Sequence, residues 1–192
     1  LRNPLNIAQG QLQLAQNDVQ SSHLDAVERA HDRMNALIDD LLTLARDGEQ
    51  IGELESVELA GVVEGCWESV ATDRATLTVA SDHRIRADRS RLQQLFENLL
   101  RNAVEHGGAS VSITVGDLEG GFFVEDDGSG IPEEDRSDVF SAGFSTTDDG
   151  TGFGLNIAKQ VAEAHDWTIQ VTEGRDGGAR FEVTGVRIDE GS

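Results

Sequence analysis

The sequence predicts an α+β protein, in which an antiparallel two-helix hairpin precedes an α/β sandwich with a mixed sheet packed on helices. Residues 1–47 contain no strand pattern and carry apolar residues at helical spacing. Residues 47–52 form a polar, glycine-bearing linker, after which alternating strand patterns and helical patterns interleave. We therefore expect two domains, at residues 1–48 and 53–192.

The first domain has a heptad pattern. Across residues 1–19 the apolar positions alternate in steps of four and three, and the pattern resumes across residues 24–45. Because a two-helix hairpin cannot bury both sides of this seam alone, we expect a homodimer in which residues 1–47 of two copies form a four-helix bundle. His31 lies on the seam, where a packed or hydrogen-bonded core histidine is a more ordinary expectation than a chemical role.

The second domain is predicted to hold two long helices among short strands. One helix covers residues 88–106, with an aspartate at its start and Gly107 as its stop, and the other covers residues 151–165. Residues 128–150 hold glycines, acids and few apolar positions, which predicts a loop or lid. The remaining expected elements are a strand and helix within 57–70 and strands at 76–80, 84–87, 110–115, 121–125, 167–172 and 179–186.

The charge excludes several classes of partner. The 192 residues include 15 basic and 36 acidic side chains, a formal net charge of -21, and Lys159 is the single lysine. Such a surface repels DNA, RNA and anionic lipid, so we expect no nucleic-acid partner and no direct membrane contact. Lysine depletion with excess carboxylate is typical of proteins that work in concentrated salt, which screens self-repulsion. We expect a halophilic archaeon as the source, with an ordinary acidic cytosolic protein as the alternative.

Cysteine content and hydropathy indicate the compartment. Cys66 is the single cysteine, so no disulfide can form within one chain. No segment approaches the roughly 20 apolar residues that span a bilayer, and the start has no signal-peptide pattern. We expect a cytoplasmic fragment of a longer protein, whose upstream part could carry a sensor or a membrane anchor.

Three segments of the second domain together predict a pocket for a nucleotide with its metal, and the first lies on the helix at 88–106. Asn98 and Asn102 are four residues apart on one face of this helix, and His106 is one further turn along. Asparagine carbonyls are hard oxygen donors that suit Mg²⁺. A solvated helix face is the ordinary alternative.

The second segment is Asp126 with the two glycines that follow it. Asp126 closes a predicted strand, and a carboxylate there can accept an exocyclic amine. Gly128 and Gly130 allow the backbone to approach a flat ligand closely. A tight turn that ends a hairpin is the alternative interpretation.

The third segment opens the helix at 151–165 with Gly150, Gly152 and Gly154. The free backbone N–H groups and the helix dipole at this N-terminus favour an anion, and phosphate is the expected ligand. A plain capping loop explains the glycines equally well when they are considered alone.

In this order, the three segments resemble the core of a sensor histidine kinase. The resemblance covers essentially all 192 residues. Residues 1–5 resemble the end of the family's H box, residues 98–102 its N box, residues 126–130 its G1 box and residues 150–154 its G2 box, while Phe140 and Phe144 stand where its F box belongs.

The resemblance implies a Bergerat-type site for ATP and Mg²⁺. Asn102 would be the principal Mg²⁺ ligand, Asn98 would support the metal and the phosphates, and Asp126 would receive the adenine amine. His106 joins the two asparagines as a catalytic candidate, and His106 and Arg101 are candidates for phosphate contacts. The other implied nucleotide-binding residues are Gly128, Gly130, Ile131, Phe144, Gly150, Thr151, Gly152, Phe153, Gly154 and Leu155. Residues 140–149 would form the ATP lid, which Phe144 packs back on the domain.

The resemblance also implies a reaction. In the family, a phosphate-accepting histidine stands two positions before the leucine that is Leu1 here, and neither His23 nor His31 has its sequence context. We expect transfer of the γ-phosphoryl group of ATP to a histidine upstream of this chain and onward to an aspartate of a response regulator receiver domain. We do not expect this chain to phosphorylate itself.

Two alternatives stay open. The first is an ATPase of the same GHKL superfamily, whose members place a glutamate base where Asn98 stands. Glu97 is adjacent but points about 100° away on a regular helix. The second is a nucleotide-binding pseudokinase or dimeric scaffold that no longer performs phosphoryl transfer, although the complete pocket motifs argue against a loss of nucleotide binding.

Overall fold

The computed structural model describes residues 52–70, 74–108, 110–145 and 151–189, and single positions between 8 and 38. The described positions from 8 to 14 and from 23 to 38 are helical, in agreement with the helices predicted there. The pairing of these helices, most of the loop between them and residues 47–51 of the predicted linker lie outside the described residues. Among the described residues, no helix is both long and apolar enough to cross a membrane.

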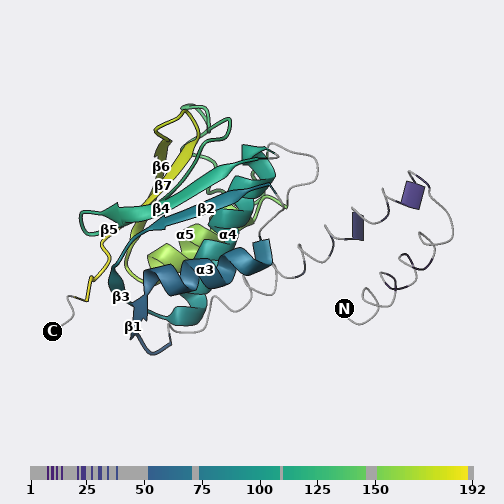
Figure 1. The fold of residues 1–192 in the computed structure, drawn as a ribbon. Coiled ribbons are helices and arrows are strands. Elements are labelled where there is room, and N and C mark those ends of the chain that lie inside the picture. The colour runs from purple at the N-terminus through teal and green to yellow at the C-terminus, as the bar shows by residue number, and fades with distance from the viewer. Residues whose placement is uncertain are drawn as a thin grey trace.

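The described elements of the second domain form a mixed sheet with helices on one face (Figure 1). β2 pairs with β4 in parallel, and the other neighbours in the order β2-β4-β5-β7-β6 are antiparallel. β1 and β3 form a separate antiparallel pair. This arrangement confirms the predicted α+β class. The elements are β1 (Glu55–Glu58), α3 (Leu59–Val70), β2 (Thr76–Ala80), β3 (Arg84–Ala87), α4 (Arg89–Gly107), β4 (Ser112–Leu118), β5 (Gly121–Asp126), α5 (Gly154–Ala164), β6 (Thr168–Glu173) and β7 (Ala179–Thr184).

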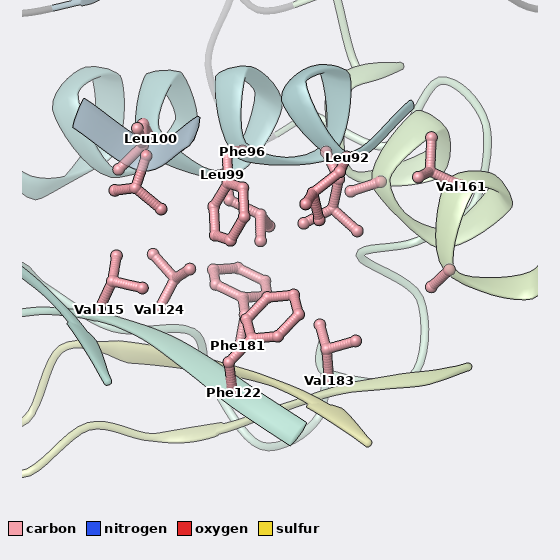
Figure 2. Close-up of a cluster of buried hydrophobic side chains, with 14 of the residues drawn as sticks. Leu92, Phe96, Leu99, Leu100, Val115, Phe122, Val124, Val161, Phe181 and Val183 are labelled. Carbon is pink, nitrogen blue, oxygen red and sulfur yellow. The ribbon is translucent and has the colours of Figure 1, made fainter. Parts of the chain in front are cut away.

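The core lies between α4, α5 and the large sheet. Figure 2 shows side chains of α4 pointing toward Phe122 of β5 and Phe181 of β7. The rings of Phe96 and Phe122 lie 5.1 Å apart, and both are completely buried. Burial of each such side chain contributes about 1.5–3 kcal/mol relative to exposure. The fully buried residues of α4 follow helical spacing: Leu92, Leu95, Phe96, Leu99 and Leu100.

Several predicted boundaries differ from the structure, and three of them have a structural reason. β4 runs from 112 to 118 instead of 110 to 115, because Gly116 continues the strand opposite Phe123, whose ring fills the space of a side chain there. α4 includes Gly107 and ends at Gly108, which has a positive φ of 95°. The last helix begins at Gly154 and not at 151, because Gly152 has a φ of 72° and belongs to the preceding loop.

Asp88 connects three parts of the domain at the start of α4. Its Oδ1 accepts hydrogen bonds from the N–H groups of Ser90 (2.9 Å) and Arg91 (3.2 Å), which caps the helix as predicted. Its Oδ2 accepts the N–H of Gly52, the last residue of the predicted linker, at 3.0 Å. Its own N–H donates to Nε2 of His165 at 3.0 Å, beyond the end of α5. Burial opposes ionisation here, but these hydrogen bonds hold the pKa of Asp88 below its ordinary value.

His165 must be neutral in this arrangement. Because Nε2 accepts from Asp88, the ring proton sits on Nδ1, which lies 2.8 Å from the carbonyl of Val161. The ring also stacks on Trp167, with centroids 4.3 Å apart. Burial lowers the pKa of His165 below its ordinary value of 6.5.

We predict that His165 makes the fold sensitive to acid. Since the folded pKa is depressed, its contribution to the free energy of unfolding is fully present above the ordinary value of 6.5 and is lost as the pH falls through the folded pKa. Urea unfolding between about pH 8 and about pH 5 measures this. His165→Phe keeps an aromatic ring against Trp167 but cannot titrate. The stability advantage of the original chain over this variant should shrink on acidification, and an advantage independent of pH would contradict the prediction.

Candidate functional site

Asp126 occupies a core position at the end of β5. Every second side chain of a strand points to the same face, so Asp126 continues the buried row of Phe122 and Val124. Its side chain is 7% exposed, and its Oδ1 accepts the N–H groups of Gly128 (2.9 Å) and Ala179 (3.2 Å). No described residue donates to its Oδ2. One oxygen is therefore fixed by the backbone, and the other remains for a donor that enters the site.

The electrostatics of Asp126 favour such a donor. Burial raises the pKa of this carboxyl, and the charges of Asp127 and Glu125 act in the same direction, while the two N–H donors oppose it. A buried carboxylate is costly unless it is hydrogen-bonded. A neutral amine that donates to Oδ2 would offset part of this cost.

Glycines surround Asp126 on two sides. A Cβ at Gly128 would lie 2.5 Å from Cα of Gly107 at the end of α4 and 2.9 Å from Oδ1 of Asp126. A Cβ at Gly178 would collide with the carbonyl of Asp126 and lie 2.7 Å from its Oδ1. Close approach therefore requires glycine at both positions. The sequence analysis predicted the first and missed Gly178, which falls between the strands predicted at 167–172 and 179–186.

Asn98 lies where α4 meets the start of α5. Its Nδ2 donates to the carbonyl of Gln94 at 2.8 Å, which leaves Oδ1 as its available atom. A Cβ at Gly154 would lie 3.1 Å from this Oδ1. The first residue of α5 is therefore beside the Asn98 oxygen, at a helix end whose N–H groups and dipole favour anions.

The other candidates on α4 differ in exposure. Asn102 and His106 are half-buried, and successive positions four apart on a helix rise by about 6 Å, which extends the polar row from Asn98 toward Gly107. Since Gly107 contacts Gly128 and Asn98 contacts Gly154, the second predicted segment meets the C-terminal end of α4 and the third meets its middle. Arg101 is exposed, and no described contact connects it with the other candidates.

The segment between β5 and α5 contacts the rest of the domain on both sides of residues 146–150. Phe140 is buried and packs edge-on against Phe181 at 6.3 Å, and its carbonyl accepts the side-chain amide of Asn156 at 2.9 Å. Phe144 is partly buried and packs against the core. The N–H of Gly143 donates to the carbonyl of Gly152 at 2.9 Å. These contacts fix where the predicted lid leaves and rejoins the domain.

The remaining candidates line this segment. Thr151 is half-buried, and its hydroxyl accepts the N–H of Phe153 at 3.4 Å. Gly130 has a positive φ of 69°. Gly150 lies outside the described residues. Partly buried apolar candidates that pack against the core are Ile131, Phe153 and Leu155.

Arg136 is a further residue that the sequence analysis missed. Its Nε donates to the carbonyl of Ile131 at 3.0 Å, and its guanidinium lies 3.9 Å from the carboxylate of Glu173 at the end of β6. It therefore holds the chain that follows Gly130 against the sheet. No local motif signals this role, because the arginine is separated in sequence from the strand end that it contacts.

Comparison with known families identifies the class of this fold and site. The histidine kinase-, DNA gyrase B-, and HSP90-like ATPase family matches residues 87–188, the part of the chain that contains all three converging segments. The second domain is thus an ATPase-type domain of this group. The His Kinase A (phospho-acceptor) domain family matches residues 1–50. With both matches in this order, the chain belongs to the sensor histidine kinase family.

Individual relatives are similar over nearly the whole chain. The sensor histidine kinase ZraS of Klebsiella oxytoca is 32% identical over 99% of this chain and 45% of its own length. Sporulation kinase A of Bacillus subtilis is 29% identical over 96% of this chain and 32% of its own length. The structure of full-length ShkA in complex with AMPPNP is 26% identical, with a TM-score of 0.70 over 98% of this chain and 44% of that one. The chain therefore spans less than half the length of these relatives.

We predict that Gly178→Ala disturbs the Asp126 site. The added methyl group would collide with the Asp126 carbonyl, so the turn must shift, at a cost of about 1–3 kcal/mol in unfolding free energy. Urea unfolding measures this cost. Gly65→Ala on α3 is the control, because nothing lies within 4 Å of its Cβ, and a glycine replaced inside a helix should gain about 0.5–1 kcal/mol. Equal stability of the two variants would show that Gly178 is not tightly packed.

Proposed function

We propose that this chain is the ATP-binding and dimerisation core of a protein histidine kinase, with ATP and Mg²⁺ as cofactors. The observation that carries the proposal is the placement of two groups along α4. Asp126, a buried carboxylate with one uncommitted oxygen, lies near its C-terminal end, and the Asn98 oxygen at its middle lies beside the N-terminus of α5. The first suits a base amine, and the second suits phosphates with a metal. Membership of the kinase family supports the same assignment.

The chemistry of the donors fits both cofactors. Asp126 would accept the adenine amine on Oδ2, while the tight approach of Gly128 leaves the base room to lie flat. Asn102 and Asn98 would offer carbonyl oxygens to Mg²⁺, which prefers oxygen ligands and shares its shell with phosphate. The N-terminus of α5 would receive phosphate oxygens at Gly152 and at Gly154, where α5 begins. Gly150, Thr151 and Arg101 belong to the proposed phosphate contacts.

The residues of this chain would act by positioning. When bound, ATP supplies the phosphoryl group that is transferred. Phosphoryl transfer requires alignment and charge neutralisation more than covalent participation of the protein. In the proposed reaction, the acceptor is a histidine of the helical domain upstream of Leu1, and an aspartate of a response regulator receiver domain receives the group afterwards. Phe144 and the segment that it anchors would limit the access of water to the site.

The structure argues against ATP hydrolysis with Glu97 as the base. The carboxylate of Glu97 accepts a hydrogen bond from the side-chain amide of Gln93 at 2.8 Å. The backbone carbonyl of Gln93 accepts one from the thiol of Cys66 on α3 at 3.5 Å. Burial and the charge of Glu97 raise the pKa of Cys66 to about 12. Glu97 therefore lies on the side of α4 that faces α3, away from Asn98 and α5.

The homodimer is part of the proposal. Val27 and Met34 lie seven residues apart on the predicted seam and are 53% and 46% exposed in the single chain, whereas His31 between them is 4% exposed. Exposed apolar residues at this spacing fit a helix that packs on a second copy. The salt-loving source also stays a proposal, which rests on the net charge of -21 and the single lysine.

We predict that Asp126→Asn abolishes most nucleotide affinity without harming the fold. The amide oxygen can still accept from Gly128 and Ala179, but the amide nitrogen would face the adenine amine, donor to donor. Loss of a hydrogen bond to a charged acceptor should weaken ATP·Mg²⁺ binding about 10–100-fold in titration calorimetry. Asp127→Asn is the matched control. Its carboxylate is exposed and accepts the N–H of Ser112, so binding should be unchanged.

The same calorimetry separates the alternatives. Asn102→Ala should remove the Mg²⁺ dependence of binding, because it deletes a proposed ligand. If the original chain binds no ATP and Asn102→Ala changes nothing, the chain is a scaffold without a nucleotide function. If Asp126→Asn binds as tightly as the original chain, Asp126 does not receive the base.

We predict that Met34→Glu converts the dimer to a monomer. A buried glutamate pair at the seam would be uncompensated in charge, and sedimentation equilibrium would report the change in mass. Leu14→Glu is the control, because Leu14 is 60% exposed and lies off the seam, so the dimer should persist. Dissociation by Leu14→Glu but not by Met34→Glu would show that the seam was assigned to the wrong face.

A further inference from the structure

Three metal-ligating side chains converge at the end of the sheet away from Asp126. Asp82 and His83 lie in the loop between β2 and β3, and Asp117 lies near the end of β4. The parallel register that pairs Ala80 with Gly116 brings this loop beside Asp117. Each residue offers one ligand atom, and the three atoms lie within 4.8 Å of one another.

The contact between His83 and Asp117 lacks the geometry of a hydrogen bond. Nδ1 of His83 and Oδ1 of Asp117 are 3.1 Å apart, and both atoms are buried, yet neither has a hydrogen-bond partner in the described part of the chain. Buried polar atoms without partners are costly. A cation that both atoms approach would supply the partner that each of them lacks.

The separation matches that of two ligands on one metal ion. Nitrogen and oxygen ligands bind Zn²⁺ at about 2.0–2.2 Å, so two of them lie about 3.0 Å apart at a right angle and about 3.4 Å apart at the tetrahedral angle. The 3.1 Å between Nδ1 and Oδ1 falls in this interval. Asp82, which is exposed, adds a third oxygen and leaves the outer side of the site to water.

The backbone holds the ligands in place. The carbonyl of His83 accepts the N–H of Leu59 at 3.1 Å, at the start of α3, and its own N–H donates to the hydroxyl of Ser81 at 3.3 Å. Asp117 is part of a strand that is paired on both edges. A site on such supports needs little rearrangement to bind an ion.

We propose that Asp82, His83 and Asp117 bind one divalent transition-metal ion, with Zn²⁺ as the probe, and that this ion joins the β2–β3 loop to β4. An imidazole nitrogen favours Zn²⁺ over Mg²⁺ and Ca²⁺, which prefer oxygen ligands. The site is separate from the nucleotide site, because Asp117 is four residues along β4 from the partner of Asp126, or about 13 Å. The inference does not depend on the proposed kinase function.

Equilibrium dialysis with elemental analysis tests the proposal on chelator-treated protein in excess Mg²⁺, which occupies oxygen-only sites. The original chain should take up one Zn²⁺, and its thermal unfolding midpoint should rise with Zn²⁺ concentration because the ion binds the folded state. Asp117→Asn and His83→Ala should each weaken Zn²⁺ binding about tenfold or more. Co²⁺ in place of Zn²⁺ should give a visible absorption band that the His83→Ala variant lacks.

Matched controls separate this site from general acidity. His23→Ala and Asp138→Asn remove an exposed histidine and an exposed carboxylate elsewhere, and both should bind Zn²⁺ as the original chain does. Asp82→Asn, at an exposed position, tests the site even where a buried substitution disturbs folding. No uptake of Zn²⁺ by the original chain, or equal uptake by all variants, would overturn the proposal and leave His83 and Asp117 as an ion pair.

Discussion

The site depends on the burial of one carboxylate at a position that the fold reserves for an apolar side chain. Asp126 continues the row of Phe122 and Val124, so the packing of β5 against α4 directs it inward. The domain accommodates the charge with two backbone N–H donors on Oδ1 and with glycines that permit their approach. The pKa of Asp126 is raised because its hydrogen bonds do not fully offset the free-energy cost of burying the charged carboxylate. An amine donor at Oδ2 would lower that cost, so ligand binding at the proposed site would also relieve the cost of burying Asp126.

α4 converts this local arrangement into a site with two ends. Its apolar face, with Phe96 at the centre, is fixed by the sheet, and this fixes the direction of the half-buried polar row beside it. Gly107 then meets Gly128 at the C-terminal end of α4, while Asn98 meets Gly154 at its middle. In the proposed site, the spacing between the base end and the phosphate end is therefore set by helix geometry rather than by loops. The distance between these two ends therefore does not depend on the conformation of the segment between β5 and α5.

Much of this organisation was predictable from the sequence because it is local. The cap and periodicity of α4 and the strand patterns of β2 and β3 depend on neighbours in the chain. The bounds of these three elements were predicted within one residue. The role of Gly178 was not predictable, since it arises from the pairing of β5 with β7, whose residues are far apart in sequence. The start of α5 was placed three residues early for a related reason: Gly152 is held by Gly143 in a loop, a contact that no helix signal reveals. The positions of Gly150 and the hairpin loop remain predictions.

The contacts of Asp88 connect the end of α5 with Gly52, where the described part of the second domain begins. α5 begins at Gly154, beside the Asn98 oxygen, and the chain just beyond its end accepts the Asp88 N–H on His165. The same Asp88 accepts the N–H of Gly52, where the chain enters the domain from the linker. Two hydrogen bonds through Asp88 therefore connect the residue after α5 with Gly52, while the other end of α5 lies beside the Asn98 oxygen of the proposed phosphate site.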